Sequence, residues 1–303
     1  MRQPDFFIIG APKCGTTSLY AYLKRHPDIY LPAIKEPHYF YTGSRQFRAI
    51  KDLDSYLALF ADAKPGQICG EASSCYILSP DSLVDILQFN PRAKIIAMVR
   101  NPIDMILSYY DHKVYSFQED VPDFALAWSI SDLREKGHRL PATCTAPEQL
   151  NYKEVARIGS KLKLVVERVP AEQRLIILFD DFASDPERIY GETLRFLGVR
   201  PWQAGGFTRE NPRKTHKWPG VARFLMYPPF PFDVIKADLK RVLGPRAKEL
   251  GRKLYKMEAN PVQPRRPPGQ VRRDLATALL DDMKLIESLV GRDLAHWRRE
   301  RTL

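Results

Sequence analysis

The sequence lacks three features that would each assign the chain to a particular class of protein. No apolar run approaches the roughly 20 residues of a membrane-spanning helix, and stretches such as residues 94–99 are far shorter. No CxxC pair occurs, so the cysteines are expected to be free thiols rather than disulfide partners or metal ligands. No internal repeat or low-complexity tail is present. These absences predict a globular protein without a transmembrane helix and without a metal site.

A signal peptide is also not expected. The chain enters an apolar, strand-like run within five residues, which leaves no room for the charged and apolar segments of such a signal. We therefore expect a cytoplasmic protein. The net charge of +11 favours anionic ligands or surfaces. The basic C-terminal third could contact the inner face of a membrane, whereas no nucleic-acid partner is expected because no recognisable binding motif carries the basic residues.

Short apolar runs alternate with helical patterns over the first 200 residues. Strands are expected at residues 6–9, 67–70, 93–99 and 174–179. Helices are expected at residues 15–25, 53–60, 80–89, 102–115, 124–136, 152–168 and 186–197. This alternation predicts an α/β fold of the phosphate-loop type, with three layers in which helices flank a central parallel sheet. Residues 201–303 are proline-rich with a final helix at about 271–289, and we expect them to form a helical extension of one domain spanning residues 1–303.

The segment "GAPKCGTTS", which begins at Gly10, has the composition of a phosphate-binding loop. A strand-like run precedes it and a helix follows, so backbone N–H groups and the positive end of a helix dipole would face an anion. A nucleoside triphosphate loop has lysine directly after its second glycine, where this chain has Thr16, and no convincing acidic magnesium ligand follows a later strand. The pattern favours a 5′-phosphate with one further small anionic group, bound without metal. The residues expected to contact this ligand are Lys13, Cys14, Gly15, Thr16, Thr17 and Ser18.

A second motif, "VRNPIDMILS", places an arginine at the end of a buried strand and a serine on the helix that follows. Arg100 would lie at the carboxyl end of the sheet, where ligands bind in open α/β folds. Its planar guanidinium can donate two parallel hydrogen bonds to one phosphate. Ser108 would lie on the helix that Pro102 opens.

Together the two motifs resemble the sulfotransferases that use 3′-phosphoadenosine 5′-phosphosulfate (PAPS), closest to the branch of bacterial and heparan sulfate sulfotransferases. The resemblance implies metal-free sulfuryl transfer, with 3′-phosphoadenosine 5′-phosphate (PAP) as product and Lys13 at the 5′-phosphosulfate. The cofactor contacts that it implies beyond the first loop are Arg100, Ser108, Tyr152, Arg213 and Lys214. The ending "GRDLAHW" is similar to that of many bacterial members, and Trp297 is expected to pack on the domain.

The resemblance also implies a general base in the segment "KEPHYF". Glu36 matches the base of the heparan sulfate branch and His38 its companion. Desolvation would raise the pKa of Glu36 towards neutrality, with Lys35 or His38 tuning it. A histidine, His38 or His112, is the alternative base, because cytosolic members of the family use one.

One departure from the family pattern lies in the segment "GEASS". Relatives carry a lysine directed at the bridging oxygen where this chain has Ala72. Either Lys13 alone serves the leaving group, or another cation compensates. Glu71, Ser73 and His112 are candidates for contact with the acceptor, and a structural ion pair is the alternative for Glu71.

Three functions follow as hypotheses. The first is a PAPS-dependent sulfotransferase acting on a hydroxyl, or less readily an amine, of a carbohydrate, glycolipid or secondary metabolite. The second is a small-molecule or nucleotide kinase with the same loop architecture, which would need magnesium and a lysine after Gly15. The third is a non-catalytic binder of nucleotides or polyanions.

Overall fold

The computed structural model describes residues 2–207, 214–228, 259–261 and 269–298. The strands of its main sheet are β1 (Phe6–Gly10), β2 (Ile29–Tyr30), β3 (Ile68–Ala72), β4 (Lys94–Val99) and β5 (Arg174–Leu178). They lie in the order β2-β3-β1-β4-β5, and every neighbouring pair is parallel. The predicted central parallel sheet is confirmed. All four expected strands are present, and β2 is an additional strand of only two residues.

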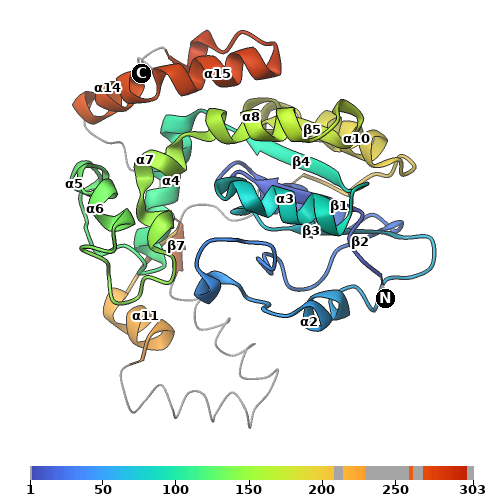
Figure 1. Ribbon diagram of the computed structural model, residues 1–303, viewed down its shortest axis with the longest axis horizontal. Coiled ribbons are helices and arrows are strands. Elements are labelled where there is room, and N and C mark those ends of the chain that lie inside the picture. The colour runs from blue at the N-terminus through green and yellow to red at the C-terminus, as the bar shows by residue number, and fades with distance from the viewer. Residues whose placement is uncertain (1, 208–213, 229–258, 262–268, 299–303) are drawn as a thin grey trace.

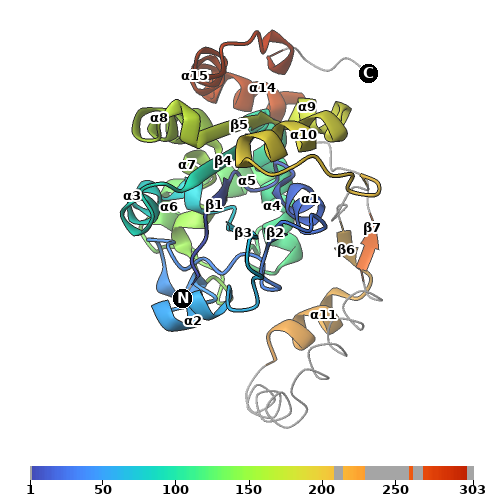
Figure 2. The same ribbon diagram turned by 90° about the vertical axis from the view of Figure 1, so that its right-hand side faces the viewer.

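Helices cover both faces of this sheet. The described helices are α1 (Thr16–Leu23), α2 (Leu53–Ala58), α3 (Pro80–Phe89), α4 (Pro102–Tyr115), α5 (Phe124–Ser129), α6 (Ser131–Glu135), α7 (Tyr152–Ala156), α8 (Ile158–Arg168), α9 (Phe179–Ser184), α10 (Pro186–Leu197), α11 (Pro219–Met226), α14 (Gly269–Ala278) and α15 (Leu280–Val290). Figure 2 shows α3 and α8 on one face of the sheet and α1 and α10 on the other. The three-layer arrangement follows from strands that are apolar on both faces and must be covered on both.

The centre of the sheet positions the site. All five residues of β1 are buried, and five of the six residues of β4 beside it are buried too. Because the strands are parallel, the segments that follow β1, β3 and β4 all emerge at one edge of the sheet. That edge therefore collects the residues that come directly after Gly10, Ala72 and Val99.

The C-terminal helices return to this core, above α8 in Figure 1. Asp282 on α15 accepts hydrogen bonds from the backbone N–H groups of Gly159 (2.7 Å) and Ser160 (3.0 Å), at the start of α8. Arg272 on α14 pairs with Asp104 on α4 at 2.8 Å. These contacts fasten α15 to α8 and α14 to α4.

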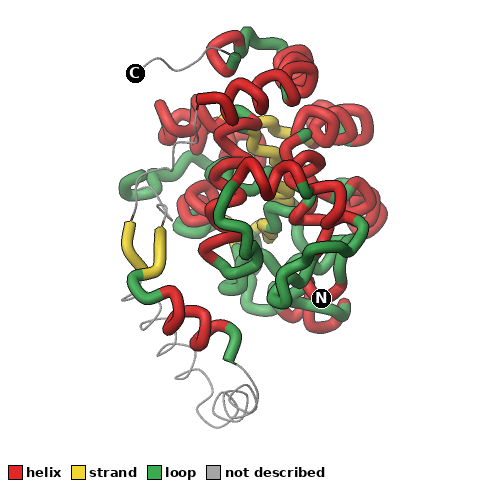
Figure 3. Tube along the Cα trace, turned by 90° about the vertical axis from the view of Figure 1, so that its left-hand side faces the viewer, coloured by secondary structure: helices red, strands yellow, loops and turns green. Residues whose placement is uncertain are grey.

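A second, two-stranded antiparallel sheet joins β6 (Lys214–His216) to β7 (Ala259–Pro261). Figure 3 shows it with α11 outside the layers of the main sheet. The His216 ring stacks on Tyr115 with 4.2 Å between ring centroids, and His216 Nε2 lies 2.7 Å from the Tyr115 carbonyl oxygen. This contact ties β6 to the end of α4. Across the described ranges, no helix has the length and apolar character needed to cross a bilayer.

Candidate active site

The loop between β1 and α1 is shaped by its two glycines. Gly10 has φ = 143°, and a Cβ there would lie 2.5 Å from the carbonyl oxygen of Ser74. Gly15 has φ = 92° and precedes α1, and a Cβ there would lie 3.1 Å from the Phe182 ring and 3.3 Å from the Phe179 ring. Side chains at either position would meet these neighbours, so the close turn depends on glycine.

The loop presents positive charge at the N-terminus of α1. In the described part of the chain no side chain caps α1, and the first turn of α1 contains no acidic residue. Lys13 and Arg100 both act electrostatically on Cys14, whose thiol is buried in the loop. Burial raises the pKa of Cys14 to about 12, so this thiol stays protonated and adds no negative charge. Such an N-terminus with an adjacent cation suits a bound phosphate.

The two predicted phosphate-binding motifs meet at this loop. Arg100 follows β4, and its Nη1 donates a hydrogen bond to the carbonyl oxygen of Lys13 at 3.4 Å. The Arg100 guanidinium also lies 4.5 Å from the ring centroid of Phe179, the first residue of α9. Ser108 lies on α4, the helix that starts two residues after Arg100, and is 6% exposed. Both motifs therefore belong to one site at the carboxyl edge of the sheet.

The turn that carries Glu36 and His38 is attached to the end of β3. The Glu36 N–H donates to the carbonyl oxygen of Ala72 at 2.9 Å, and the His38 N–H donates to Ser73 Oγ at 3.0 Å. Since β3 pairs directly with β1, these bonds bring the turn beside the phosphate-binding loop. The geometry thus collects Lys13, Arg100 and Glu36 at neighbouring strand ends.

The expectation that the pKa of Glu36 is raised was wrong. Burial alone would raise it, but hydrogen bonding to His38 and the charge of Lys35 outweigh burial and hold the pKa well below its usual range. Lys35 Nζ lies 2.5 Å from Glu36 Oε1, Ser74 Oγ donates to the same oxygen at 3.0 Å, and His38 Nε2 lies 3.5 Å from Oε2. The Glu36 carboxylate is consequently ionised and held by three neighbours.

Glu71 and Ser73 lie beneath this turn rather than facing an open cleft. Both side chains are fully buried. Glu71 Oε2 accepts hydrogen bonds from the hydroxyls of Tyr56 (3.1 Å) and Tyr76 (2.9 Å), and burial raises the pKa of Glu71 to about 7. Tyr76 in turn accepts a hydrogen bond from the Phe40 N–H. Their positions indicate support of the Glu36 turn, not direct contact with an acceptor.

His112 is exposed to solvent on α4, close enough to Glu36 and Lys13 to interact with both electrostatically. The protein atoms around the ring, together with the positive charges of Lys13 and Lys113, lower the pKa of His112 from its usual value. His112 is therefore neutral near pH 7 and can accept a proton. A lone histidine on an amphipathic helix gives no such signal in the sequence.

Three predicted cofactor contacts remain: Tyr152, Arg213 and Lys214. The Tyr152 side chain is fully buried, and its hydroxyl donates to Glu119 Oε2 at 2.7 Å, so it is a core residue rather than a phosphate ligand in this structure. Arg213 lies outside the described residues. Lys214 opens β6, and its side chain lies outside the described part.

Two residues near the site were not predicted from the sequence. Phe179 was expected to end a strand, yet it begins α9 and lies against both Arg100 and Gly15. Lys113 is 4% exposed, donates to the side-chain oxygens of Gln118 and Gln149 at 2.7 Å each, and has its pKa lowered to about 8 by burial. Neither position has a local pattern that distinguishes it from ordinary core or surface residues.

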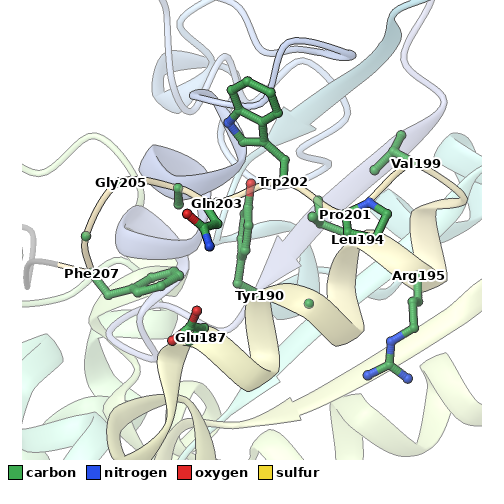
Figure 4. A pocket seen from close by; sticks show the side chains of 13 residues that line it. Glu187, Tyr190, Leu194, Arg195, Val199, Pro201, Trp202, Gln203, Gly205 and Phe207 are labelled. Atoms are coloured by element: carbon green, nitrogen blue, oxygen red, sulfur yellow. The ribbon is translucent and has the colours of Figure 1, made fainter.

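A hollow of about 620 Å³ lies apart from these residues, between α10 and residues 199–207 (Figure 4). Tyr190, Trp202 and Phe207 contribute aromatic walls, and none of the predicted site residues lines it. In the described ranges no group of three or more histidine, cysteine or acidic side chains could hold a metal ion.

The sheet, the loop and the strand-end arginine define an α/β protein whose loop, at the carboxyl edge of a parallel sheet, is suited to a phosphorylated ligand. Comparison with known proteins identifies the family within this class. The family model of the sulfotransferase domain matches residues 3–205. The chain belongs to the sulfotransferase family, and this membership does not support the kinase hypothesis.

Three relatives illustrate the range of the similarity. A bifunctional heparan sulfate N-deacetylase/N-sulfotransferase 4 from Mus musculus is 30% identical over 210 residues, covering 65% of this chain and 22% of the relative. Carbohydrate sulfotransferase 15 from Homo sapiens is 31% identical over 251 residues, covering 65% of this chain and 44% of the relative. The crystal structure of a sulfotransferase from Alicyclobacillus acidocaldarius is 27% identical with a TM-score of 0.70, covering 99% of this chain and 100% of that one. The chain thus spans less than half the length of these two curated relatives.

Proposed function

We propose that this enzyme transfers the sulfuryl group of PAPS to a hydroxyl of a carbohydrate acceptor, with Glu36 as general base. The observation that carries the proposal is the hydrogen bond from Arg100 to the Lys13 carbonyl oxygen. It brings a strand-end arginine and a helix N-terminus with a loop lysine into one site, as a ligand with two separate phosphate groups requires. The Glu36 turn is hydrogen-bonded to Ala72, at the end of the neighbouring strand β3.

The residues at this edge fit the donor chemically. Backbone N–H groups at the start of α1, Lys13 and Arg100 are all hydrogen-bond donors, and Phe179 offers an apolar ring beside them. The donor supplies an activated sulfuryl group with PAP as the leaving group. Lys13 and the α1 N-terminus would neutralise charge that develops on the 5′-phosphate, and Arg100 with Ser108 would hold the 3′-phosphate. Both roles need fixed donors rather than a metal ion.

Glu36, the proposed base, has a pKa well below its usual range before the donor binds. A carboxylate with a depressed pKa is fully ionised but takes a proton weakly. Lys35 is one of the neighbours that keep the pKa of Glu36 low. An anionic donor in the site would attract Lys35 away from Glu36 and so raise the pKa of the carboxylate towards a useful value. We therefore expect Glu36 to become a competent base only when the donor is present.

Lys35 is also our candidate for the cation that compensates for Ala72. It directly precedes Glu36, whose N–H binds the Ala72 carbonyl oxygen. Lys113, another lysine near the site, is 4% exposed and already donates to two glutamine side chains. Lys35, with a side chain 19% exposed and on a turn, is better placed to follow a bound anion.

The acceptor is proposed from the relatives. Several are named for carbohydrate or heparan sulfate sulfation, and a shared fold does not by itself fix the acceptor. A carbohydrate hydroxyl is therefore the first class to test. Glycolipids, amino sugars and small alcohols form the comparison set.

The test is a transfer assay with ³⁵S-labelled PAPS in EDTA, against desulfated polysaccharides, amino sugars, a glycolipid and small alcohols. Label should enter a carbohydrate hydroxyl without added metal. Glu36→Gln should lower kcat by about 10²-fold or more and leave PAP affinity within about twofold, since Glu36 is not a phosphate ligand. His112→Gln is the matched variant for the alternative base. A large loss of kcat in His112→Gln with an active Glu36→Gln would assign the base to the histidine, and labelling of no acceptor would contradict the proposed activity.

A further inference from the structure

The last described residues, 291–298, contact the segments that follow the carboxyl ends of β4 and β5. We call residues 291–298 the C-terminal turn. Asn101 Nδ2, directly after Arg100, donates to the carbonyl oxygen of Trp297 at 3.0 Å. Trp297 Nε1 donates to Asp180 Oδ2 at 2.6 Å. Asn101 follows β4 and Asp180 lies two residues after β5, so one tryptophan bridges two neighbouring strands at their carboxyl ends.

Both the oxygen and the nitrogen of the Asn101 side chain are hydrogen-bonded. Its Oδ1 accepts from the Ile103 N–H at 2.9 Å and so caps α4, while its Nδ2 is used by Trp297. The residue is 6% exposed. Because both ends of the amide are engaged, the Trp297 carbonyl helps to fix the turn in which Arg100 leaves β4 and α4 begins.

The other side of the bridge is α9, which has only six residues and little stability of its own. Two adjacent acids at its start bind the C-terminal turn: Asp180 also accepts from His296 Nε2 at 2.9 Å, and Asp181 pairs with Arg292. The same helix places Phe179 under the Arg100 guanidinium. It also places the Phe182 ring against Gly15 of the phosphate-binding loop.

We propose that the C-terminal turn is a positioning element of the donor site, in which Trp297 and Asp180 act on the 3′-phosphate through Arg100 and α9. The inference rests on the proposed use of PAPS. Neither residue touches the ligand in this scheme. Trp297, which is 3% exposed, holds the Arg100 turn by its carbonyl oxygen and α9 by its indole N–H.

Variants of Asp180 can distinguish the effect of its hydrogen bond to Trp297 from the effect of its negative charge. Asp180 interacts electrostatically with Arg100, and a carboxylate near a phosphate site opposes phosphate binding. If charge alone mattered, Asp180→Asn and Asp180→Ala should both bind PAP more tightly than the wild type. If the hydrogen bond to Trp297 matters, asparagine should preserve affinity through its carbonyl oxygen, and alanine should lose it.

The experiment is calorimetric titration of PAP into the wild type and four variants, with steady-state kinetics and thermal unfolding of each. Trp297→Phe and Asp180→Ala should raise the Kd for PAP and the KM for PAPS about tenfold, the loss typical of one charge-assisted hydrogen bond, with kcat at saturation changed less than about twofold. Asp180→Asn should stay within about threefold of the wild type. Trp202→Phe, the same change at an exposed tryptophan on residues 199–207, should bind as the wild type does.

Each outcome bears on the inference. A Trp297→Phe enzyme that unfolds at a lower temperature but keeps wild-type PAP affinity would show that the turn only stabilises the fold, and would overturn the proposal. Tighter binding by both Asp180 variants would overturn it as well. A wild type that does not bind PAP would refute the proposed donor itself, which distinguishes that failure from failure of the positioning role.

Discussion

Replacing Glu71 with glutamine should stabilise the protein more at pH 8 than at pH 5. The carboxyl is fully buried at the end of β3, where its Oε2 accepts two tyrosine hydroxyls and its Oε1 has no partner among the described residues. Burial raises the pKa of Glu71 from 4.5 to about 7, and the nearby charge of Glu36 adds a smaller effect in the same direction. Glutamine keeps an acceptor for both hydroxyls and carries no charge at any pH.

The sign and size of the effect follow from proton linkage. A carboxyl with a higher pKa in the folded chain binds more protons when folded, so the free energy of unfolding falls as pH rises. The fall begins near the unfolded pKa of 4.5 and is complete above the folded pKa of about 7. At 1.36 kcal/mol per pH unit, the wild type should lose about 3 kcal/mol from this one group. The Glu71→Gln variant should not show this loss.

The assay is urea unfolding of both proteins at pH 5 and pH 8, followed by tryptophan fluorescence. The quantity of interest is the difference in unfolding free energy between variant and wild type, because other groups titrate in both and cancel. That difference should move in favour of the variant by about 2.5 kcal/mol between the two pH values, since part of the effect is already lost at pH 5. An equal difference at both pH values would refute the reasoning, since it would mean that Glu71 does not change its charge over this range in the folded protein.

Three further predictions test other parts of the structure. Arg100→Ala should raise the Kd for PAP by about 10- to 100-fold in calorimetry, because a charge-assisted pair to phosphate is lost, and Arg100→Lys should recover only part of it. Arg134→Met should cost about 3–5 kcal/mol in urea unfolding, because it leaves the Glu119 carboxylate buried without its ion pair; the double variant with Glu119→Leu should recover most of the loss. Asp282→Ala should lower the free energy of unfolding by about 1–2 kcal/mol, because the first N–H groups of α8 lose their acceptor.

Helices with strong local start signals could be predicted from the sequence. The ranges of α3 and α4 match expectation, since each begins with a proline in its first turn after a polar residue. Residues 152–168 instead form two helices that break at Arg157, where Asp282 binds the start of the second. That partner lies more than 120 residues away in the sequence, so a local pattern cannot reveal the break.

Some residues of the site could likewise be predicted from the sequence, and others could not. Lys13 and Arg100 could be placed together from sequence because each lies within three residues of the end of a strand in one parallel sheet. The burial of Glu71 and Ser73 could not, since strand alternation leaves open which face carries the ligand. The approach of Trp297 to Asn101 joins residues 196 positions apart and had no local sign at all.

Backbone strain gives an independent reason to connect the loop with the Glu36 turn. In the described part of the chain five non-glycine residues have positive φ, and three of them are Lys13 (64°), Glu36 (62°) and His38 (53°). Such conformations cost of order 1–3 kcal/mol each and persist only where surrounding contacts fix them. For Glu36 and His38 those contacts are the backbone hydrogen bonds to Ala72 and Ser73. A chain that keeps three strained residues at neighbouring strand ends gains no stability from them, and the proposed transfer reaction supplies the reason: a cation and a carboxylate must face the same ligand.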